Sequence, residues 1–494
     1  MAGGAAAAII LTRACRCSGV IRKMNRKACI VGAGPNGLAA AVVLGQAGLH
    51  VDVLEAEATP GGAARTMELT LPGYRHDFGA AVFPLGAGSP FFSSLPLRDY
   101  GLEWIHSPAP LAHPLDDGTA VVLERDLSDT EASLRVDGRV WRKLVETFVE
   151  RWSEFARDVL RPLPTLPRHP WLMARFGMSA ILSARTIARR FRNERTQALF
   201  AGLAAHSFLS LDEPLSAAPG LLMAVLAHAV GWPIPRGGSQ SLTDALCQYL
   251  ATLGGKVKTS SRVETLSALP GYDLLLCDVT PRQLLKLAEE RLSDHYKHRL
   301  QAYRYGSGVF KVDYALHAPI PWKASDCGRA ATLHLGGSFE EIAASEQAVR
   351  EGRHADRPFV LLAQPSLFDP SRAPQGKHTA WAYCHVPHGS NTNVLSKLED
   401  QIERFAPGFR DCVAARHVSS PADLERMDAN LVGGDIAGGV MDIRQFLFRP
   451  TWKHYTTSAK DIYLCSSSTP PGGGVHGMCG YHAAKMALSR LKLS

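Results

Sequence analysis

Residues 27–55 read KACIVGAGPNGLAAAVVLGQAGLHVDVLE, and this stretch decides the fold. An apolar strand leads into a glycine-rich turn, a helical run of small and apolar residues follows, and a second apolar strand ends at an acid. That order predicts a βαβ unit with parallel strands and with the turn GAGPNG at the start of its helix. The stretch therefore predicts an α/β protein with a Rossmann-like dinucleotide-binding domain.

The turn GAGPNG has the spacing GxGxxG, and each of its glycines has a physical role. Gly32 permits a tight turn, Gly34 lets the backbone approach a pyrophosphate, and Gly37 allows the helix to pack closely on the strand. Glu55, at the end of the second strand, can accept hydrogen bonds from a ribose diol. The alternative is a glycine-rich turn in an unrelated α/β fold. The register of strand, turn, helix, second strand and acid favours a dinucleotide site.

A second pair of glycines follows within the stretch ATPGGAART. Gly61 and Gly62 predict another close approach of backbone to ligand, and Arg65 supplies a fixed cation for a phosphate or for the flavin edge. This arrangement resembles the two-dinucleotide-binding-motif flavoproteins, which include phytoene desaturases and amine oxidases. The resemblance implies that the first glycines and Glu55 hold the ADP half of FAD, and that the second pair holds the rest.

Two later stretches support the same resemblance. A strand expected to end near Val263 falls where these flavoproteins bring backbone groups to the adenine. Near the C-terminus, PPGGGVHGMCGYHAA places Gly472, Gly473 and Gly474 at an expected helix start, which would face the flavin or the pyrophosphate. A flexible tail is the alternative. The predicted FAD-binding residues are Gly32, Gly34, Pro35, Asn36, Gly37, Glu55, Ala56, Gly61, Gly62, Arg65, Val263, Gly473, Gly474 and Val475.

Long motifs of unusual composition mark the rest of the chain, among them GGSQSLTDAL, PSLFDPSRAPQGKHTAW and YLCSSSTPPGGGVHGMCGYHAA. Together with GAGPNGLAAA and GGAA they resemble the phytoene-desaturase-like FAD-dependent oxidoreductases, in the branch of pyridine nucleotide-disulfide oxidoreductase domain-containing proteins. The resemblance covers nearly everything after Lys27. It implies that FAD is the cofactor and that the enzyme removes hydrogen from an apolar or amphipathic substrate, by hydride transfer to the flavin.

The chain is expected to form an FAD-binding domain in three parts with two insertions between them. Helical periodicity, broken by RPLPTLPRHP, marks the first insertion, and stretches such as GVFKVDYAL and HTAWAYCHV predict an antiparallel-sheet substrate domain. The expected segments are a leader or mis-assigned start at 1–26, FAD-binding parts at 27–135, 236–300 and 456–494, a helical insertion at 136–235 and a substrate domain at 301–455.

Residues 1–25 are rich in alanine and arginine and contain no acid, which resembles an organelle transit peptide. Alternatively Met24, which opens MNRKACIVGAG, is the natural start. The first interpretation predicts a mitochondrial matrix protein, and the second predicts a cytoplasmic protein of bacterial origin.

The net charge of +8 belongs largely to the first 27 residues, which hold six basic residues and no acid. The rest of the chain carries about +2, which is typical of an enzyme and argues against a nucleic acid partner. The ten cysteines contain no CxxC pair, a pattern typical of a reducing compartment. This argues against a dithiol redox centre, and Cys15 and Cys17 lack a second pair of ligands, so no metal site is expected.

Two ionisable residues are candidates for catalysis because they are expected near the cofactor. Asp278 follows the strand DLLLC, and His476 lies in the C-terminal glycine-rich loop. The competing role for each is a solvated loop residue or a helix cap.

The stretch WLMARFGMSAILSARTIARRF places Leu172, Phe176, Ile187 and Phe191 at roughly helical spacing among arginines. A basic amphipathic helix of this kind can lie on an anionic membrane, so peripheral membrane contact is one interpretation. An ordinary helix with a solvated charged face is the other.

Two further functions compete with the desaturase-type enzyme. Rab GDP-dissociation inhibitors resemble this fold yet carry lipidated partners, which suggests a non-catalytic lipid- or protein-binding protein. A flavin amine oxidase is the third hypothesis. Glu55 and the uninterrupted glycines favour an enzyme, since a scaffold without FAD needs neither. The electron acceptor, whether oxygen, a quinone or another compound, and the oligomeric state stay open.

Overall fold

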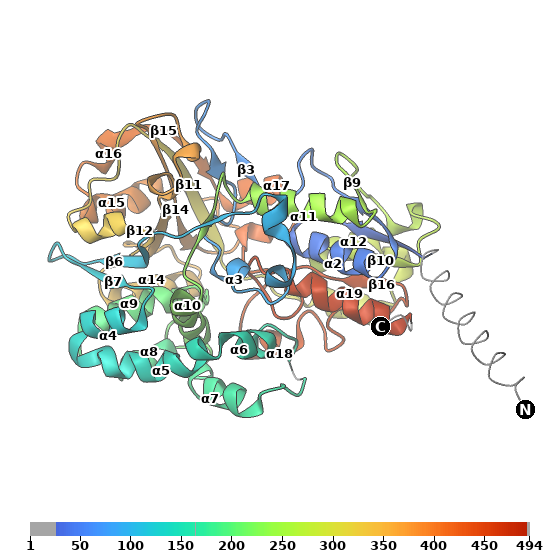
Figure 1. Cartoon of the computed structure of the whole chain (residues 1–494), viewed down its shortest axis with the longest axis horizontal. Helices are drawn as coiled ribbons and strands as arrows, with labels where there is room; N and C mark the ends of the chain where they lie inside the picture. The colour runs from blue at the N-terminus through green and yellow to red at the C-terminus, as the bar shows by residue number, and fades with distance from the viewer. Residues whose placement is uncertain (1–25, 164, 492–494) are drawn as a thin grey trace, which may run out of the picture.

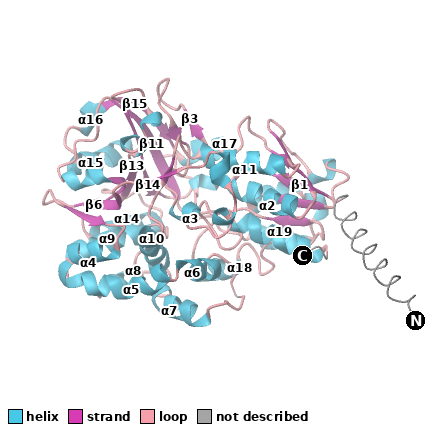
Figure 2. Ribbon diagram, viewed as in Figure 1, coloured by secondary structure: helices cyan, strands magenta, loops and turns pink. Residues whose placement is uncertain are grey.

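Two sheets organise the chain, and helices pack against both of them (Figure 2). The computed structural model describes residues 26–163 and 165–491, so the predicted leader lies almost entirely outside the described residues. The parallel sheet lies on one side of the molecule beside helices α2 and α19, and the larger sheet lies on the other side above a group of helices (Figure 1).

The parallel sheet has five strands in the order β16-β10-β1-β2-β9. All neighbouring strands run parallel, and they come from three distant parts of the chain. The prediction of a Rossmann-like α/β domain is confirmed. The strands are β1 (Lys27–Val31), β2 (His50–Leu54), β9 (Lys256–Lys258), β10 (Leu274–Cys277) and β16 (Ile462–Leu464).

Helices bury both faces of the parallel sheet. A proline occupies the start of α2, where its missing N–H leaves no helical hydrogen bond unmade. A Cβ on Gly480 of α19 would lie 1.8 Å from the backbone oxygen of Asn36, so only glycine permits α19 to pack this closely on α2. One face carries α2 (Pro35–Gln46), α11 (Gln240–Thr252) and α19 (Met478–Arg490), and the other carries α12 (Pro281–Leu287) and α13 (Asp294–Gln301).

The second sheet has seven strands in the order β15-β11-β14-β13-β12-β6-β7. All pairs are antiparallel except β12 with β6. The strands predicted from GVFKVDYAL and HTAWAYCHV form β11 and β14, and their register pairs Gly308 with Val386. The strands are β6 (Ala109–Pro114), β7 (Ala120–Leu123), β11 (Gly308–Leu316), β12 (Ala330–Leu335), β13 (Val360–Ala363), β14 (His378–Val386) and β15 (Val413–Ser419).

One expected boundary differs from this arrangement. Strands β6 and β7 fall inside the segment 27–135, which the sequence assigns to the FAD-binding domain, yet they belong to the seven-stranded sheet. The reason is that β6 pairs with β12, more than two hundred residues later, and local periodicity carries no sign of such a partner.

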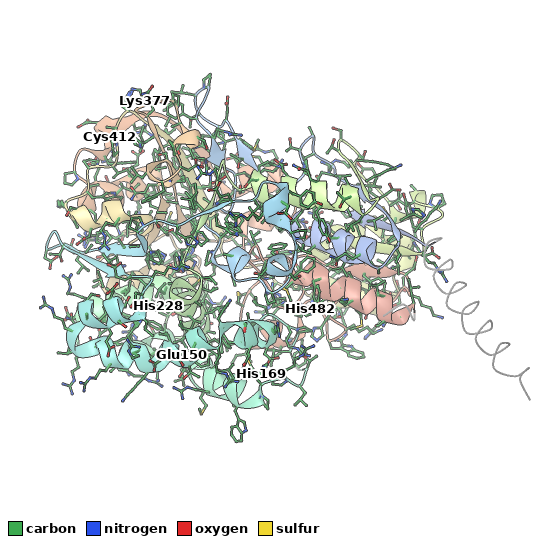
Figure 3. The ribbon with its side chains drawn as sticks, in the orientation of Figure 1. Glu150, His169, His228, Lys377, Cys412 and His482 are labelled. Carbon is green, nitrogen blue, oxygen red and sulfur yellow. The ribbon has the colours of Figure 1, made fainter. Side chains whose placement is uncertain are left out.

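The helical insertion packs under the seven-stranded sheet around an aromatic core that includes Trp141, Phe148 and Phe155. His228 belongs to this core (Figure 3), since its Nε2 accepts a hydrogen bond from Trp141 Nε1 at 3.0 Å. His482 of α19 contacts the backbone oxygen of Leu160 at 3.0 Å and so joins the insertion to the FAD-binding domain. The helices are α5 (Gly138–Glu150), α6 (Trp152–Val159), α7 (Pro170–Ala180), α8 (Ala184–Ala188), α9 (Glu194–Ala205) and α10 (Ala217–Ala229). Helix α4 (Leu127–Ser133) packs against α5 as well, although it precedes the predicted start of the insertion at residue 136.

The predicted amphipathic stretch turns its apolar side inward. Leu172, Phe176, Ile187 and Phe191 are all buried in the helical core, so they are unavailable to a membrane. Within residues 26–163 and 165–491, no helix is long and apolar enough to cross a bilayer.

Shorter elements complete the fold. Two small sheets pair β3 (Thr66–Met67) with β4 (His76–Asp77), and β5 (Trp104–Ile105) with β8 (Ile234–Pro235). The remaining helices are α3 (Pro84–Ala87), α14 (Phe339–Arg350), α15 (Leu395–Phe405), α16 (Phe409–Cys412), α17 (Pro421–Met427) and α18 (Ile443–Phe448).

Candidate functional site

A cavity of about 860 Å³ begins at the carboxyl ends of β1, β2 and β10 and continues to the seven-stranded sheet. Ligands of open parallel sheets bind outside this edge, where the chain turns from strand to helix. Of the predicted cofactor-binding residues, twelve line the cavity: Gly32, Gly34, Pro35, Asn36, Glu55, Ala56, Gly62, Arg65, Val263, Gly473, Gly474 and Val475.

The first glycine turn presents the start of α2 to this cavity. Gly32 has φ +99°, a conformation that glycine adopts readily, and Gly34 caps the helix without a side-chain hydrogen bond. The first turn of α2 contains no acid, so its backbone N–H groups and helix dipole favour an anion. The Oδ1 atom of Asn36 is buried without a hydrogen-bond partner. A glycine N-cap that lets a ligand approach the helix start and an unpaired acceptor fit the phosphates and hydroxyls of a dinucleotide, while the N–H of Gly37 in the same turn is taken up by Asp278.

Glu55 is held in place from two sides. Its Oε2 accepts a hydrogen bond from the backbone N–H of Ala33 at 2.7 Å, and its Oε1 accepts one from that of Glu57 at 2.9 Å. Each carboxylate oxygen can accept a further hydrogen bond, which leaves capacity for a ribose diol. The carboxylate therefore lies at the cavity wall in the position that the sequence predicts for the ribose acceptor.

The adenine-side strand ends earlier than expected. β9 stops at Lys258, and Ser260, with φ +49°, turns the chain away. A non-glycine residue in this left-handed region interrupts a strand. Val263 therefore lines the cavity from a loop rather than from the end of a strand.

Arg65 fixes the second glycine loop. Its Nε donates to the backbone oxygen of Gly62 at 2.8 Å, its Nη2 donates to that of Met427 at 2.7 Å, and the guanidinium lies 5.1 Å from the ring centre of Phe78. A Cβ on Gly62 would lie 3.4 Å from Gly34 Cα, so the two glycine loops meet. Gly61 supports the loop from outside the cavity, donating its N–H to the backbone oxygen of Ala33 at 2.9 Å.

Asp278 forms the floor of the first glycine turn. Its Oδ2 accepts a hydrogen bond from Gly37 N at 2.8 Å, and a Cβ on Gly34 would lie 2.6 Å from that oxygen. Burial, with the nearby carboxylates of Asp428 and Glu55, raises the pKa of Asp278 to about 7. The role of Gly37 is thus to donate to Asp278 and to pack against Gly32, and Gly37 does not line the cavity.

His476, the other catalytic candidate, caps the start of helix α19 with its side chain. Its Nδ1 accepts from the backbone N–H of Met478 at 3.0 Å, and burial lowers its pKa to about 4. The helix expected to start at Gly472–Gly474 begins only at Met478. Gly472, Gly474 and Gly477 all have positive φ, a conformation that a right-handed helix cannot contain. The loop before α19, rather than a helix N-terminus, therefore faces the cofactor side of the cavity.

The seven-stranded sheet supplies residues that the sequence did not single out. Lys311 of β11 is ion-paired with Asp313 and lies 5.8 Å from the ring centre of Trp381. Trp381 and Tyr383 of β14 stack with centroids 5.5 Å apart and an interplanar angle of 14°. Their i, i+2 spacing in the strand HTAWAYCHV puts both rings on one face of the sheet. This spacing is the feature of the sequence from which the aromatic pair could have been predicted.

Helix α10 and its neighbours make the rest of this end apolar. Ala218, Pro219, Leu222 and Met223 of α10 line the cavity. The uncharged segment around α10 thus forms an apolar wall of the cavity, and aromatic side chains lie beside it. Those aromatic lining residues are Phe176, Phe208, Trp232 and Phe446.

Comparison with known proteins agrees with this geometry. Residues 30–95 match the family model described as an NAD(P)-binding Rossmann-like domain. An oxidoreductase from Methanosarcina mazei has a similar fold, with a TM-score of 0.63 at 17% identity, covering 94% of this chain and all of that one. Putrescine oxidase bound to putrescine gives a TM-score of 0.59 at 16% identity, covering 95% of this chain and 99% of that one.

The fold and the site define a flavoprotein: the chain is an FAD-dependent oxidoreductase. Pyridine nucleotide-disulfide oxidoreductase domain-containing protein 2 of Mus musculus is 28% identical to it, over 95% of this chain and 94% of the relative. A lycopene-forming phytoene desaturase of Pseudescherichia vulneris is 24% identical, over 94% of this chain and 99% of the relative. The predicted resemblance to phytoene-desaturase-like oxidoreductases and the prediction of FAD as cofactor are confirmed.

Proposed function

We propose that this oxidoreductase is of the phytoene-desaturase-like type and dehydrogenates an apolar or amphipathic substrate. The observation that carries the proposal is the apolar wall of α10, which continues the same cavity that the glycine loops line. Burial of apolar surface there supplies binding energy of roughly 25 cal/mol per Å², and it orients a substrate without charged groups.

The bound flavin supplies hydride acceptance, and the residues of the chain supply position and exclusion of water. Arg65 and Asp278 hold the two glycine loops in place. Trp381 and Tyr383 offer a flat aromatic surface at the substrate end of the cavity. We infer that a planar or extended hydrocarbon segment lies against these rings.

A flavin amine oxidase is the second candidate, and the stacked pair Trp381 and Tyr383 is the observation that favours it. Aromatic faces attract cations. Lys311 argues in the other direction, because it also lines the cavity and its own ammonium group, ion-paired with Asp313, already lies 5.8 Å from the centre of the Trp381 ring. We therefore rank the apolar substrate first.

Peripheral membrane contact is part of the proposal, through other side chains than the four that the sequence singled out. Trp171, Met178 and Ile181 of the α7 region are 87%, 69% and 55% exposed, and Phe448 and Trp452 near α18 are 50% and 60% exposed. The inner sides of the same two helices line the cavity through Phe176 and Phe446. Residues 161–193 and 443–460 contain no acid, so the surface suits an anionic bilayer.

Flotation with liposomes of neutral and anionic lipid tests this surface. We expect the wild-type chain to float with the anionic liposomes, and a Trp171→Ser/Trp452→Ser double variant to remain with the unbound protein. A Leu71→Ser variant, which changes another exposed apolar residue, is the matched control. Equal flotation of the wild type and the double variant contradicts the proposed contact.

The absorption spectrum of the purified protein tests the cofactor and the function together. We expect a flavin band at about 450 nm, weakened in a Glu55→Ala variant, and anaerobic bleaching of that band by phytoene in detergent micelles. Bleaching by putrescine instead would favour the amine oxidase. Failure of the purified protein to take up FAD would contradict the proposal of an oxidoreductase and would favour a binding protein for lipidated partners.

Two remaining expectations have direct tests. Mixing the reduced enzyme with oxygen or with a quinone shows which acceptor restores the flavin band. N-terminal sequencing of the native protein tests localisation: a start at Met24 contradicts the transit peptide and the mitochondrial matrix, and favours the bacterial cytoplasm.

A further inference from the structure

Four buried or half-buried histidines gather at the substrate end of the cavity, and the function proposed above gives them no role. His206 follows α9 and lines the cavity, whereas His334 of β12, His385 of β14 and His113 of β6 lie behind it. The sequence distributes them over nearly three hundred residues, so only the fold brings them together.

His206 and His334 form a direct hydrogen bond, with their Nε2 atoms 3.1 Å apart. Only one hydrogen can lie between two imidazole nitrogens, so one ring donates and the other accepts. Both rings pack against Trp232, each with its centre 5.9 Å from the indole. A Cβ on Gly202 would lie 2.7 Å from His334 Nδ1, so α9 holds the His334 ring firmly.

The surroundings of the pair keep its rings neutral. Burial, and secondarily the positive charge that His385 can carry, lowers the pKa of His206 to about 4. Burial also lowers the pKa of His334, with His206 and His113 as further causes. The facing groups are His385, which contacts Glu346 at 2.8 Å, and His113, which contacts the backbone oxygen of Gly337 at 2.9 Å.

We propose that His206 is the proton acceptor of the dehydrogenation and that His334 is its positioning residue. The inference rests on the function proposed above and names the group that completes it. His206 is the member of the pair that reaches the cavity, and His334 fixes the tautomer and orientation of its ring.

The step balances with the groups already named. Bound FAD would supply hydride acceptance, so the hydrogen and both electrons of one substrate C–H bond would leave as a hydride. The neighbouring carbon loses a proton to the free ring nitrogen of His206, and the electron pair of that C–H bond becomes the new double bond. The resulting imidazolium donates its Nε2–H to His334, which stabilises the charge until the proton leaves to solvent.

A His206→Gln variant removes the base and keeps a hydrogen-bond donor toward His334. We expect anaerobic bleaching of the flavin by phytoene to slow by about 10²-fold or more, the usual contribution of a general base, with unchanged FAD content. A His388→Gln variant is the matched control, because glutamine can still donate to the backbone oxygen of Gly306 and His388 lies outside the cavity lining. Its rate is expected to stay within about twofold of wild type.

Imidazole ¹⁵N NMR supplies a readout that is independent of turnover. The signal lost in His206→Gln identifies His206, and we expect that ring to be neutral at pH 7 as a single tautomer, with the tautomer preference lost in His334→Phe. A charged His206 at pH 7, or bleaching by His206→Gln at the wild-type rate, overturns the inference. A wild-type protein that phytoene fails to bleach contradicts the proposed function instead, and the NMR result then decides on His206 alone.

Discussion

Arg372 and Asp77 form an ion pair, 2.6 Å between Nη2 and Oδ2, in which neither side chain has any exposed surface. Asp77 also accepts hydrogen bonds from the backbone N–H of Ser239 at 2.8 Å and from the hydroxyl of Thr66 at 2.8 Å. The pair thereby connects the loop before β14 with β4 and with the start of α11. Although burial acts to raise the pKa of Asp77, Arg372 and these hydrogen bonds lower it overall.

Replacing one member of this pair leaves the other charge buried without its partner. We expect Arg372→Met to reduce the free energy of unfolding by about 3–5 kcal/mol, measured by urea denaturation. The partly exposed pair of Arg350 and Glu213 provides the control, and Arg350→Met is expected to cost roughly 0–1 kcal/mol. Equal losses in the two variants would contradict the structural role of Asp77 and Arg372.

A methyl group on helix α19 tests how closely α19 approaches α2. Gly480→Ala places a Cβ 1.8 Å from Asn36 O, so α19 must move and the protein is expected to lose roughly 1–3 kcal/mol. Gly177→Ala in α7 meets nothing within 4 Å, and there alanine is expected to stabilise by about 0.4–1 kcal/mol. In thermal unfolding we therefore expect the midpoint temperature to fall in Gly480→Ala and to rise in Gly177→Ala.

The stability of the FAD-free protein is expected to fall as pH rises toward 7. The pKa of Asp278 is about 7 in the folded protein and roughly 3.9 in an unfolded chain. Between these values the folded state binds more protons, so its stability decreases with increasing pH. Asp278→Asn can still accept from Gly37, and it is expected to remove this dependence. Identical pH profiles for wild type and variant would contradict the assignment.

His476 is expected to stabilise helix α19 rather than to take part in catalysis. His476→Ala removes the acceptor for Met478 N, which is expected to cost about 1 kcal/mol, as for other helix caps. Asparagine at the same position can restore an acceptor. A large loss of flavin reduction in His476→Ala, without a loss of stability, would instead support the catalytic role that the sequence suggested.

The cofactor side of the site was predictable because its signals are local. Gly32, Gly34 and Glu55 lie within one βαβ unit, and the spacing of that unit determines how they meet a dinucleotide. The hydrogen bond from Gly37 to Asp278 was not predictable in the same way, because it joins residues that only the pairing of β1 with β10 brings together.

The substrate side was less accessible from sequence. The strands carrying Lys311 and Trp381 were predicted, but no local pattern shows that β11 and β14 turn these side chains toward the same cavity. The meeting of His206 with His334 depends on the packing of α9 against β12, which periodicity does not specify.

The parallel sheet also sets an order of events during synthesis. β1 and β2 leave the ribosome early, but β16 and α19, which complete the sheet and cover α2, are made only at residues 462–490. Until then one edge of β10 and the side of α2 that α19 covers have no partner, and such surfaces are prone to aggregate. The wall of the flavin pocket that Gly473, Gly474 and Val475 form is therefore complete only once nearly the whole polypeptide has been made.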